Sequence, residues 1–299
     1  MKLFSGSSNK PLAEKIAHAL NISISPVEIF IFPDGERRVT LEERVVDKDV
    51  IIVQSTGTPA DTNYMELFFL TDSVKRSGAR SVTAVIPYLG YQRQDHVFRD
   101  GEARSFAVIV NIIESLQIDR IVTFDLHSIK LVELFHAPFV HLSALPLFAK
   151  VINEEHMIDN ETVLVSPDMG GKRRVGILAE MLGGIPTVSI EKNRDLKTGE
   201  ISAHIVHGEV KKRVIIVDDM ISSGQTIVEA VKILKKHGAE RQWVFATHAV
   251  FSQKAGAVLA KVEVEKIYIT DTLFVPEEKR PGNLEILSVA DIIAEQLAV

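Results

Sequence analysis

The chain carries two copies of one sequence pattern, and this internal repeat limits its fold more than any other feature. The segment LFSGSSNKPLAEKIAHALN, from Leu3, aligns with LVSPDMGGKRRVGILAEMLG, from Leu164. DVIIVQST, from Asp49, aligns with RVIIVDDM, from Arg213, and further along both copies RIVTFDLH aligns with KIYITDTL. Because the three pairs occur in the same order, we expect two copies of one structural unit.

Each copy alternates short β-branched runs with amphipathic segments. Between residues 226 and 237, for example, one helical face carries four aliphatic side chains, those of Ile227, Val228, Val231 and Leu234. Such alternation predicts an α/β fold in which each half forms a mainly parallel sheet flanked by helices.

The boundary between the halves is expected near residues 142–150, around Pro146. It gives a first domain over residues 1–145 and a second over residues 146–299. The last segment, LEILSVADIIAEQLAV, is typical of a short strand and a helix, and this tail is expected to pack back across one of the halves.

Composition excludes several classes of function. The net charge of −6 is mild and the basic residues are scattered, so we expect no nucleic-acid partner. No apolar run approaches the roughly 20 residues that cross a bilayer, which predicts no membrane partner and a cytoplasmic location. Because the chain has no cysteine, a metal ion must be held by oxygen or imidazole.

The stretch VIIVDDMISSGQT, residues 214–226, is the strongest functional signal in the residues themselves. A strand followed by a small-residue loop and an amphipathic helix directs backbone N–H groups and the helix dipole at one point, which suits a phosphate. On its own, such a loop is equally an ordinary strand-to-helix turn. The acid pair Asp218 and Asp219 favours a sugar phosphate, since hydroxyl groups supply donors without negative charge. The predicted phosphate loop is Ser222, Ser223, Gly224, Gln225 and Thr226.

This stretch closely resembles the ribose-phosphate binding motif of type I phosphoribosyltransferases. Together with FPDGE, YLGYQRQD, DLH, SPDMGGKRR and EKNR, it resembles the ribose-phosphate pyrophosphokinase family over essentially the whole chain. The resemblance implies two duplicated phosphoribosyltransferase-like domains. It also implies transfer of the pyrophosphoryl group of Mg-ATP to the anomeric hydroxyl of ribose 5-phosphate, which gives phosphoribosyl pyrophosphate and AMP.

The resemblance assigns ATP binding to the first half, in a homo-oligomer whose ATP site is shared across a subunit interface. Phe32 would stack on adenine, and Asp34 and Glu36 would accept hydrogen bonds from its amino edge. Without the resemblance, FPDGE is simply a good turn sequence. The other implied ATP-binding residues form the RQD segment: Arg93, Gln94 and Asp95.

The resemblance further implies a Mg²⁺ site at His127 and Asp168, although a lone histidine is more often structural. A loop for the transferred pyrophosphate would follow Asp168, and Lys192 and Arg194 would stabilise charge in the transition state. By themselves, the residues around Lys192 suggest a solvated hairpin or loop. The residues implied for the pyrophosphate loop are Asp168, Gly170, Gly171 and Lys172.

Two other functions remain open on the sequence. A phosphoribosyltransferase that consumes phosphoribosyl pyrophosphate would share residues 214–226 but would not need FPDGE and RQD. An inactive regulatory homologue should have lost Lys192, Arg194 or the acid pair, and this chain retains them. The segment HVFRDGEARSFAVIVNIIE does not resemble the bacterial form linked to regulation by ADP, which leaves that regulation and the size of the oligomer open.

Overall fold

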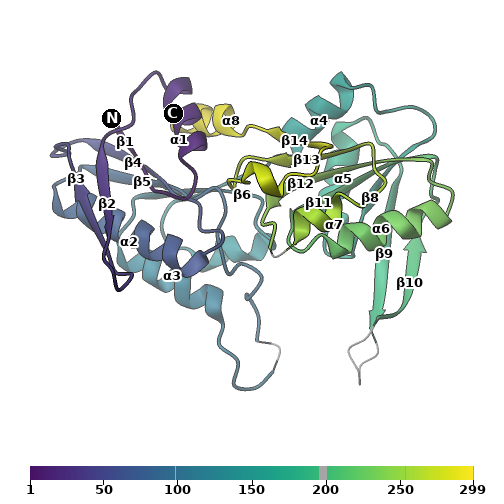
Figure 1. The fold of residues 1–299 in the computed structure, drawn as a ribbon, viewed down its shortest axis with the longest axis horizontal. Helices are drawn as coiled ribbons and strands as arrows, with labels where there is room; N and C mark the ends of the chain where they lie inside the picture. The colour runs from purple at the N-terminus through teal and green to yellow at the C-terminus, as the bar shows by residue number, and fades with distance from the viewer. Residues whose placement is uncertain (98, 195–200, 253, 299) are drawn as a thin grey trace. The chain divides into compact units, whose positions relative to one another are not determined.

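The computed structural model describes residues 1–97, 99–194, 201–252 and 254–298. They form two compact α/β units, drawn in Figure 1. Unit 1 comprises Met1–Leu142, Asp271–Phe274 and Ser288–Val299, and unit 2 comprises Ser143–Thr270 and Val275–Leu287. The predicted fold class is confirmed, since each unit is built on a mainly parallel sheet flanked by helices.

Unit 1 contains a five-stranded parallel sheet of order β1-β4-β5-β6-β7 and a separate antiparallel hairpin, β2-β3. The sheet strands are β1 (Lys2–Ser5), β4 (Asp49–Val53), β5 (Ser81–Val85), β6 (Arg120–Phe124) and β7 (Phe139–Leu142), and the hairpin strands are β2 (Val27–Ile31) and β3 (Arg37–Leu41). The helices are α1 (Lys10–Ala19), α2 (Ala60–Arg76), α3 (Ser105–Ser115), the 3₁₀ helix η1 (Ile129–Leu134) and α8 (Ala290–Leu297).

Unit 2 contains a seven-stranded sheet of order β10-β9-β8-β11-β12-β13-β14, in which only the β9-β10 pair is antiparallel among the described strands. Its strands are β8 (Thr162–Ser166), β9 (Thr187–Arg194), β10 (Ile201–His207), β11 (Arg213–Ile221), β12 (Arg241–Ala249), β13 (Lys266–Thr270) and β14 (Leu284–Leu287). Its helices are α4 (Leu145–Glu154), α5 (Lys172–Met181), α6 (Gln225–Lys236), α7 (Ala255–Leu259) and the 3₁₀ helix η2 (Glu277–Lys279).

The two sheets repeat one strand order. Strands β8-β11-β12-β13-β14 follow each other as β1-β4-β5-β6-β7 do, with β9 and β10 added beyond β8. The aligned segments from Leu3 and Leu164 contribute β1 and β8, and those from Asp49 and Arg213 contribute β4 and β11. The internal repeat in the sequence is therefore a repeat of topology.

Strand β11 is buried on both faces, as a central strand of a covered parallel sheet should be. Val214 and Ile216 belong to the core that includes Ile227 and Leu234 of α6. Ile215 and Val217 belong to the core on the other face, which is built mainly with α4 and α5. The β-branched run therefore forms the strand, and helices on both faces of the sheet bury its side chains.

The last helix of each copy completes the other unit. Helix α4 follows β7 in the chain, yet it belongs to unit 2 and packs against α5. Helix α8 follows β14, yet it belongs to unit 1 and packs against α1. The carboxylate of Asp271 holds the start of α8 in place. It accepts hydrogen bonds from the Ser288 hydroxyl at 2.7 Å and from the Val289 N–H at 2.8 Å, and it forms an ion pair with Lys15 Nζ at 2.8 Å.

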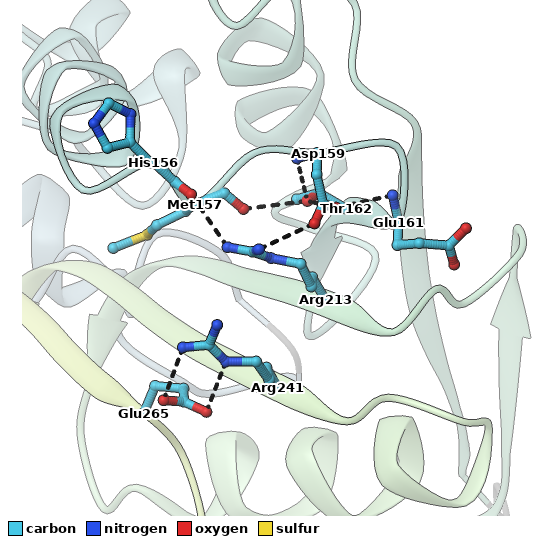
Figure 2. A network of polar contacts seen from close by, with 8 residues as sticks. All are labelled: His156, Met157, Asp159, Glu161, Thr162, Arg213, Arg241 and Glu265. Atoms are coloured by element: carbon cyan, nitrogen blue, oxygen red, sulfur yellow. Dashed lines mark hydrogen bonds and ion pairs between the residues drawn. The ribbon is translucent and has the colours of Figure 1, made fainter.

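A polar network closes the amino-terminal ends of the unit 2 strands (Figure 2). The guanidinium groups of Arg213 and Arg241 lie 5.2 Å and 4.9 Å from the Trp243 ring. Arg213 pairs with Asp159 at 3.0 Å, and Arg241 pairs with Glu265 at 3.1 Å. Cation–π and charge-assisted contacts of this kind stabilise an edge of the sheet opposite to the one that carries the acid pair.

Within the part of the chain that the structure describes, no helix is both long enough and apolar enough to span a bilayer.

Candidate functional site

The acid pair lies near the carboxyl end of β11, within the sheet. Asp218 and Asp219 are 7% and 5% exposed, and the Asp219 N–H donates to Asp218 Oδ1 at 2.8 Å. Burial, followed by the neighbouring charge of Asp219, raises the pKa of Asp218 well above the ordinary range of a carboxyl group. Two carboxylates that lie this close together and are shielded from solvent are stabilised by a ligand that donates hydrogen bonds.

Arg174, in the first turns of α5, provides a cation beside the pair. Its Nη1 lies 3.9 Å from Asp219 Oδ1, and its side chain is largely buried. This residue was not among those predicted from the sequence. It lies in the basic run after Gly171, but its contact with the acid pair exists only because β8 pairs with β11 and brings α5 close to the acids.

The predicted phosphate loop links β11 to α6 in a tight, glycine-dependent turn. Gly224 has a φ of 81°, and a Cβ there would lie 3.2 Å from Leu259 Cγ. The Gln225 N–H donates to Ser223 Oγ at 3.4 Å, and α6 begins at this residue. The loop therefore places backbone amides and hydroxyl groups at the positive end of a helix dipole.

Ser252 supports this loop from the segment after β12. Its N–H donates to the Ser222 carbonyl at 3.0 Å, and the two hydroxyl oxygens lie 3.0 Å apart. No sequence motif marks Ser252, because only the pairing of β11 with β12 brings it to Ser222.

A second loop follows β8, the strand that pairs in parallel with β11. The Gly171 N–H donates to Asp168 Oδ1 at 3.0 Å, and the Ser166 hydroxyl donates to the Asp168 carbonyl at 2.7 Å. A Cβ on Gly171 would lie 2.5 Å from Ser166 Oγ, so this position requires glycine. The charge of Asp168 also contributes to the raised pKa of Asp218, so the two loops meet at one edge of the sheet. The predicted residues of this loop are Asp168, Gly170, Gly171 and Lys172.

The FPDGE segment forms the turn between β2 and β3 in unit 1. The Gly35 N–H donates to the Phe32 carbonyl at 2.9 Å, and the Glu36 N–H donates to Asp34 Oδ1 at 3.1 Å. Phe32 remains 37% exposed, with its ring centroid 4.9 Å from that of Phe30. The ordinary turn chemistry is present, and the Phe32 ring is partly exposed with the Arg38 guanidinium 5.8 Å from its centroid.

The RQD segment combines exposed and buried side chains. Arg93 and Gln94 are exposed, whereas Asp95 is buried and its Oδ1 lies 2.7 Å from His96 Nδ1. The Arg104 side chain also donates to the Asp95 carbonyl at 2.8 Å. Arg93 and Gln94 are thus free to reach a ligand, while Asp95 organises its own segment.

The backbone around His127 is held by two side chains that were not predicted as site residues, those of the buried Gln92 and the half-buried His141. Gln92 Oε1 accepts the His127 N–H at 2.8 Å, and His141 Nε2 accepts the Leu126 N–H at 2.9 Å. Asp125 has a φ of 25°, an unusual value for a residue without glycine's freedom. Gln92 Nε2 is buried and has no hydrogen-bond partner among the described residues.

Lys192 and Arg194 lie on β9, in the antiparallel hairpin with β10. The backbone of Lys192 is paired with His204, and that of Arg194 with Ile201. Their side chains, and residues 195–200, lie outside the described part of the chain.

Two family models match the chain. A model of the N-terminal domain of ribose phosphate pyrophosphokinase matches residues 1–116, and a phosphoribosyl transferase domain model matches residues 144–275.

Full-length relatives agree with these matches. A ribose-phosphate pyrophosphokinase of Thermotoga maritima is 37% identical over 99% of this chain and 94% of its own length. One of Fusobacterium nucleatum is 36% identical, again over 99% and 94% of the two chains. The crystal structure of phosphoribosylpyrophosphate synthetase from Mycobacterium smegmatis superposes with a TM-score of 0.93 and 33% identity, covering 99% of this chain and 97% of that one.

Proposed function

The chain belongs to the ribose-phosphate pyrophosphokinase family, and we propose that it transfers the pyrophosphoryl group of Mg-ATP to the anomeric hydroxyl of D-ribose 5-phosphate. The products are 5-phospho-α-D-ribose 1-diphosphate and AMP. The observation that carries the proposal is the identity of 37% along the whole chain, which spans both copies of the repeat. The family resemblance of the sequence motifs is thereby confirmed.

Ribose 5-phosphate would bind to unit 2. Asp218 and Asp219 would accept hydrogen bonds from the ribose hydroxyls, which offset the cost of two buried charges without adding another. The 5-phosphate would be held by the amides and hydroxyls of the loop formed by Ser222, Ser223, Gly224, Gln225 and Thr226.

The pyrophosphate group in transfer would lie over the loop of Asp168, Gly170, Gly171 and Lys172. Asp168 suits Mg²⁺ because its half-exposed carboxylate is a hard oxygen ligand at an acidic edge, and His127 is the second metal residue that we propose. Among the described residues no group of three His, Asp or Glu side chains could hold an ion. Mg²⁺ would therefore take its other ligands from phosphate oxygens and water, and bound in this way it would neutralise phosphate charge.

ATP would bind to unit 1, as part of a homo-oligomer that shares the site across an interface. The exposed ring of Phe32 would stack on adenine, and Asp34 and Glu36 would accept hydrogen bonds from the adenine amino edge. Arg93, Gln94 and Asp95 would complete the site, with Asp95 acting through the shape of its segment. A cytoplasmic location also remains a prediction.

No protein nucleophile is needed for this reaction. The anomeric hydroxyl would attack the β-phosphorus in line, and Lys192 and Arg194 on β9 would stabilise the charge that develops on the β-phosphate oxygens. Positioning of the two substrates and electrostatic stabilisation would then account for most of the rate enhancement.

One assay separates the possible functions. The purified protein is incubated with Mg-ATP, with and without ribose 5-phosphate, and AMP is measured. We expect AMP release that depends on ribose 5-phosphate. An inactive regulatory homologue would release none, and a phosphoribosyltransferase would instead consume phosphoribosyl pyrophosphate with a base. Either of these results would refute the proposal.

A further inference from the structure

Unit 1 contains a loop that corresponds to the proposed pyrophosphate loop of unit 2. Residues Gly6–Ser8 follow β1 and precede α1, as residues 167–171 follow β8 and precede α5. Both loops lie at the carboxyl end of the strand that pairs in parallel with the strand carrying the acid pair or its counterpart, β11 or β4. The two loops therefore occupy the same place in the repeated topology.

A buried carboxylate lies against the unit 1 loop. Glu66, from α2, is fully buried. Its Oε1 accepts the Ser7 N–H and the Gln54 Nε2–H group at 3.1 Å, and its Oε2 accepts the Ser7 hydroxyl at 2.8 Å. Arg37 Nε lies 3.6 Å from Oε2, and this buried nitrogen has no hydrogen-bond partner among the described residues.

The donor groups around Glu66 are of the kinds that bind a small oxyanion. A backbone amide, a hydroxyl, a side-chain amide and a guanidinium converge on two carboxylate oxygens, as donors converge on phosphate in an anion site. Gly6 permits the close approach, because a Cβ there would collide with Gln54 and lie 2.9 Å from Glu66 Oε1.

Strand β4, which pairs with β1, also differs from its counterpart β11 at the position next to this loop. Gln54 occupies the position of Asp218 in the aligned segments, and its Oε1 accepts the Ser8 hydroxyl at 2.8 Å. An amide can both accept from Ser8 and donate to Glu66, which a second carboxylate could not do. Ser7, Ser8, Gln54 and Glu66 thus satisfy one another without a ligand, and Arg37 adds only an ion-pair contact at 3.6 Å.

We propose that unit 1 retains an anion-binding cradle of Ser7, Gln54 and Arg37, and that the Glu66 carboxylate fills it as an internal anion. Because this carboxylate is tethered to α2, it competes with any external anion at high effective concentration. Unit 1 therefore takes no phosphorylated ligand at this loop.

The test is chemical rescue of Glu66→Ala by formate. Removing the carboxylate leaves buried donors unpaired, so the melting temperature should fall by roughly 5–10 °C. Sodium formate should restore at least half of this loss, while sodium chloride at the same ionic strength should not. Formate should have no such effect on the wild-type protein, whose cradle is occupied.

Two control variants test whether rescue by formate requires an empty cradle, and whether formate stabilises any destabilised variant. Glu66→Gln keeps the cradle filled, so it should be destabilised but not rescued. Leu67→Ala empties a fully buried apolar site on the same helix, so formate should not rescue it either. If Glu66→Ala does not accumulate as folded protein, Glu66→Ser replaces it in the same assay.

The proposal is overturned if Glu66→Ala melts at the wild-type temperature, or if formate acts no better than chloride. It is also overturned if formate stabilises Leu67→Ala equally. The readout is thermal unfolding, so the result does not depend on the proposed catalytic activity.

Discussion

At the scale of single residues, the acid pair combines function with a cost in stability. Asp218 is buried beside another carboxylate, and the cause of its raised pKa is first its burial and then the Asp219 charge. Residues that bind ligands through buried charge are commonly replaceable by more stable ones. Asp218 should therefore be one of the positions at which stability and substrate binding conflict.

This conflict predicts a pH-dependent effect of Asp218→Asn. Because the pKa of Asp218 is raised in the folded protein, its contribution to stability is fully present below the ordinary carboxyl pKa and is lost as the pH rises through the raised value. Asparagine removes that loss. In ligand-free protein, the melting temperature of the variant minus that of the wild type should increase by a few degrees as the pH rises from about 4 to 8.

Activity provides the second half of this test. Asp218→Asn should use ribose 5-phosphate poorly at every pH, because one acceptor for the ribose hydroxyls is lost. A melting-temperature difference that does not change with pH would contradict the buried-charge explanation.

Gln92 should act as a positioning residue for His127. Gln92→Leu leaves the His127 N–H without its acceptor, a cost of about 1–3 kcal/mol that is relieved by movement of the loop. We expect the KM for Mg-ATP to rise roughly tenfold while the KM for ribose 5-phosphate stays within about twofold. Gln92→Glu retains an acceptor oxygen and should restore most of the affinity, whereas equal effects of both variants on both substrates would indicate general damage.

At the scale of secondary-structure elements, the β9-β10 hairpin carries the proposed catalytic cations. Its counterpart in chain order is the β2-β3 hairpin of unit 1, which forms a separate two-stranded sheet, whereas β9 pairs with β8 and extends the sheet of unit 2. The two copies therefore differ in how this hairpin joins the sheet as well as in side chains, which agrees with a division into ATP binding and pyrophosphoryl transfer.

Lys192→Ala should separate catalysis from binding at this hairpin. If Lys192 stabilises charge only in the transition state, kcat should fall by about 10²–10³ while both KM values change little. Steady-state kinetics with Lys232→Ala, which removes an exposed lysine from α6, provides the control. A large rise in KM at unchanged kcat would assign Lys192 to substrate binding instead.

Asp271 should govern the docking of α8. Asp271→Ala removes the acceptor for Ser288 and Val289 and the partner of Lys15, which should lower the free energy of unfolding by about 2–3 kcal/mol. Amide exchange in residues 290–297 should accelerate, as measured by hydrogen–deuterium exchange. Asp291→Ala, at an exposed position in the first turn of α8, should have a much smaller effect.

Contiguous signals allowed much of the fold and site to be predicted from sequence. The repeat predicted the two parallel sheets, and residues 214–226 predicted a loop between an acid pair and a helix, because each signal lies within one short segment. Arg174, Ser252 and Gln92 were missed, since their contacts depend on strand pairing or on loops far apart in the chain. The role of Glu66 was not predicted for the same reason, because Ser7, Gln54 and Arg37 lie in three separate segments of the chain.

At the scale of the whole molecule, the chain passes between the two units more than once. Unit 1 contains two short segments from the second copy, Asp271–Phe274 and Ser288–Val299, in addition to residues 1–142. A single cut near residue 142 would therefore leave α1 without α8 and separate α4 from the strand that precedes it. The first half alone is therefore an incomplete unit, whereas the second half contains all of unit 2 together with two segments of unit 1.

The reciprocal placement of α4 and α8 also suggests how such a chain arises. Two identical polypeptides that each lend their final helix to a partner form a swapped dimer. Joining the end of one to the start of the other in a single gene would preserve every contact and produce this connectivity. The two halves of such a fused chain can then evolve different functions. Neither half is easily lost, because the last helix of each copy packs in the unit formed by the other copy.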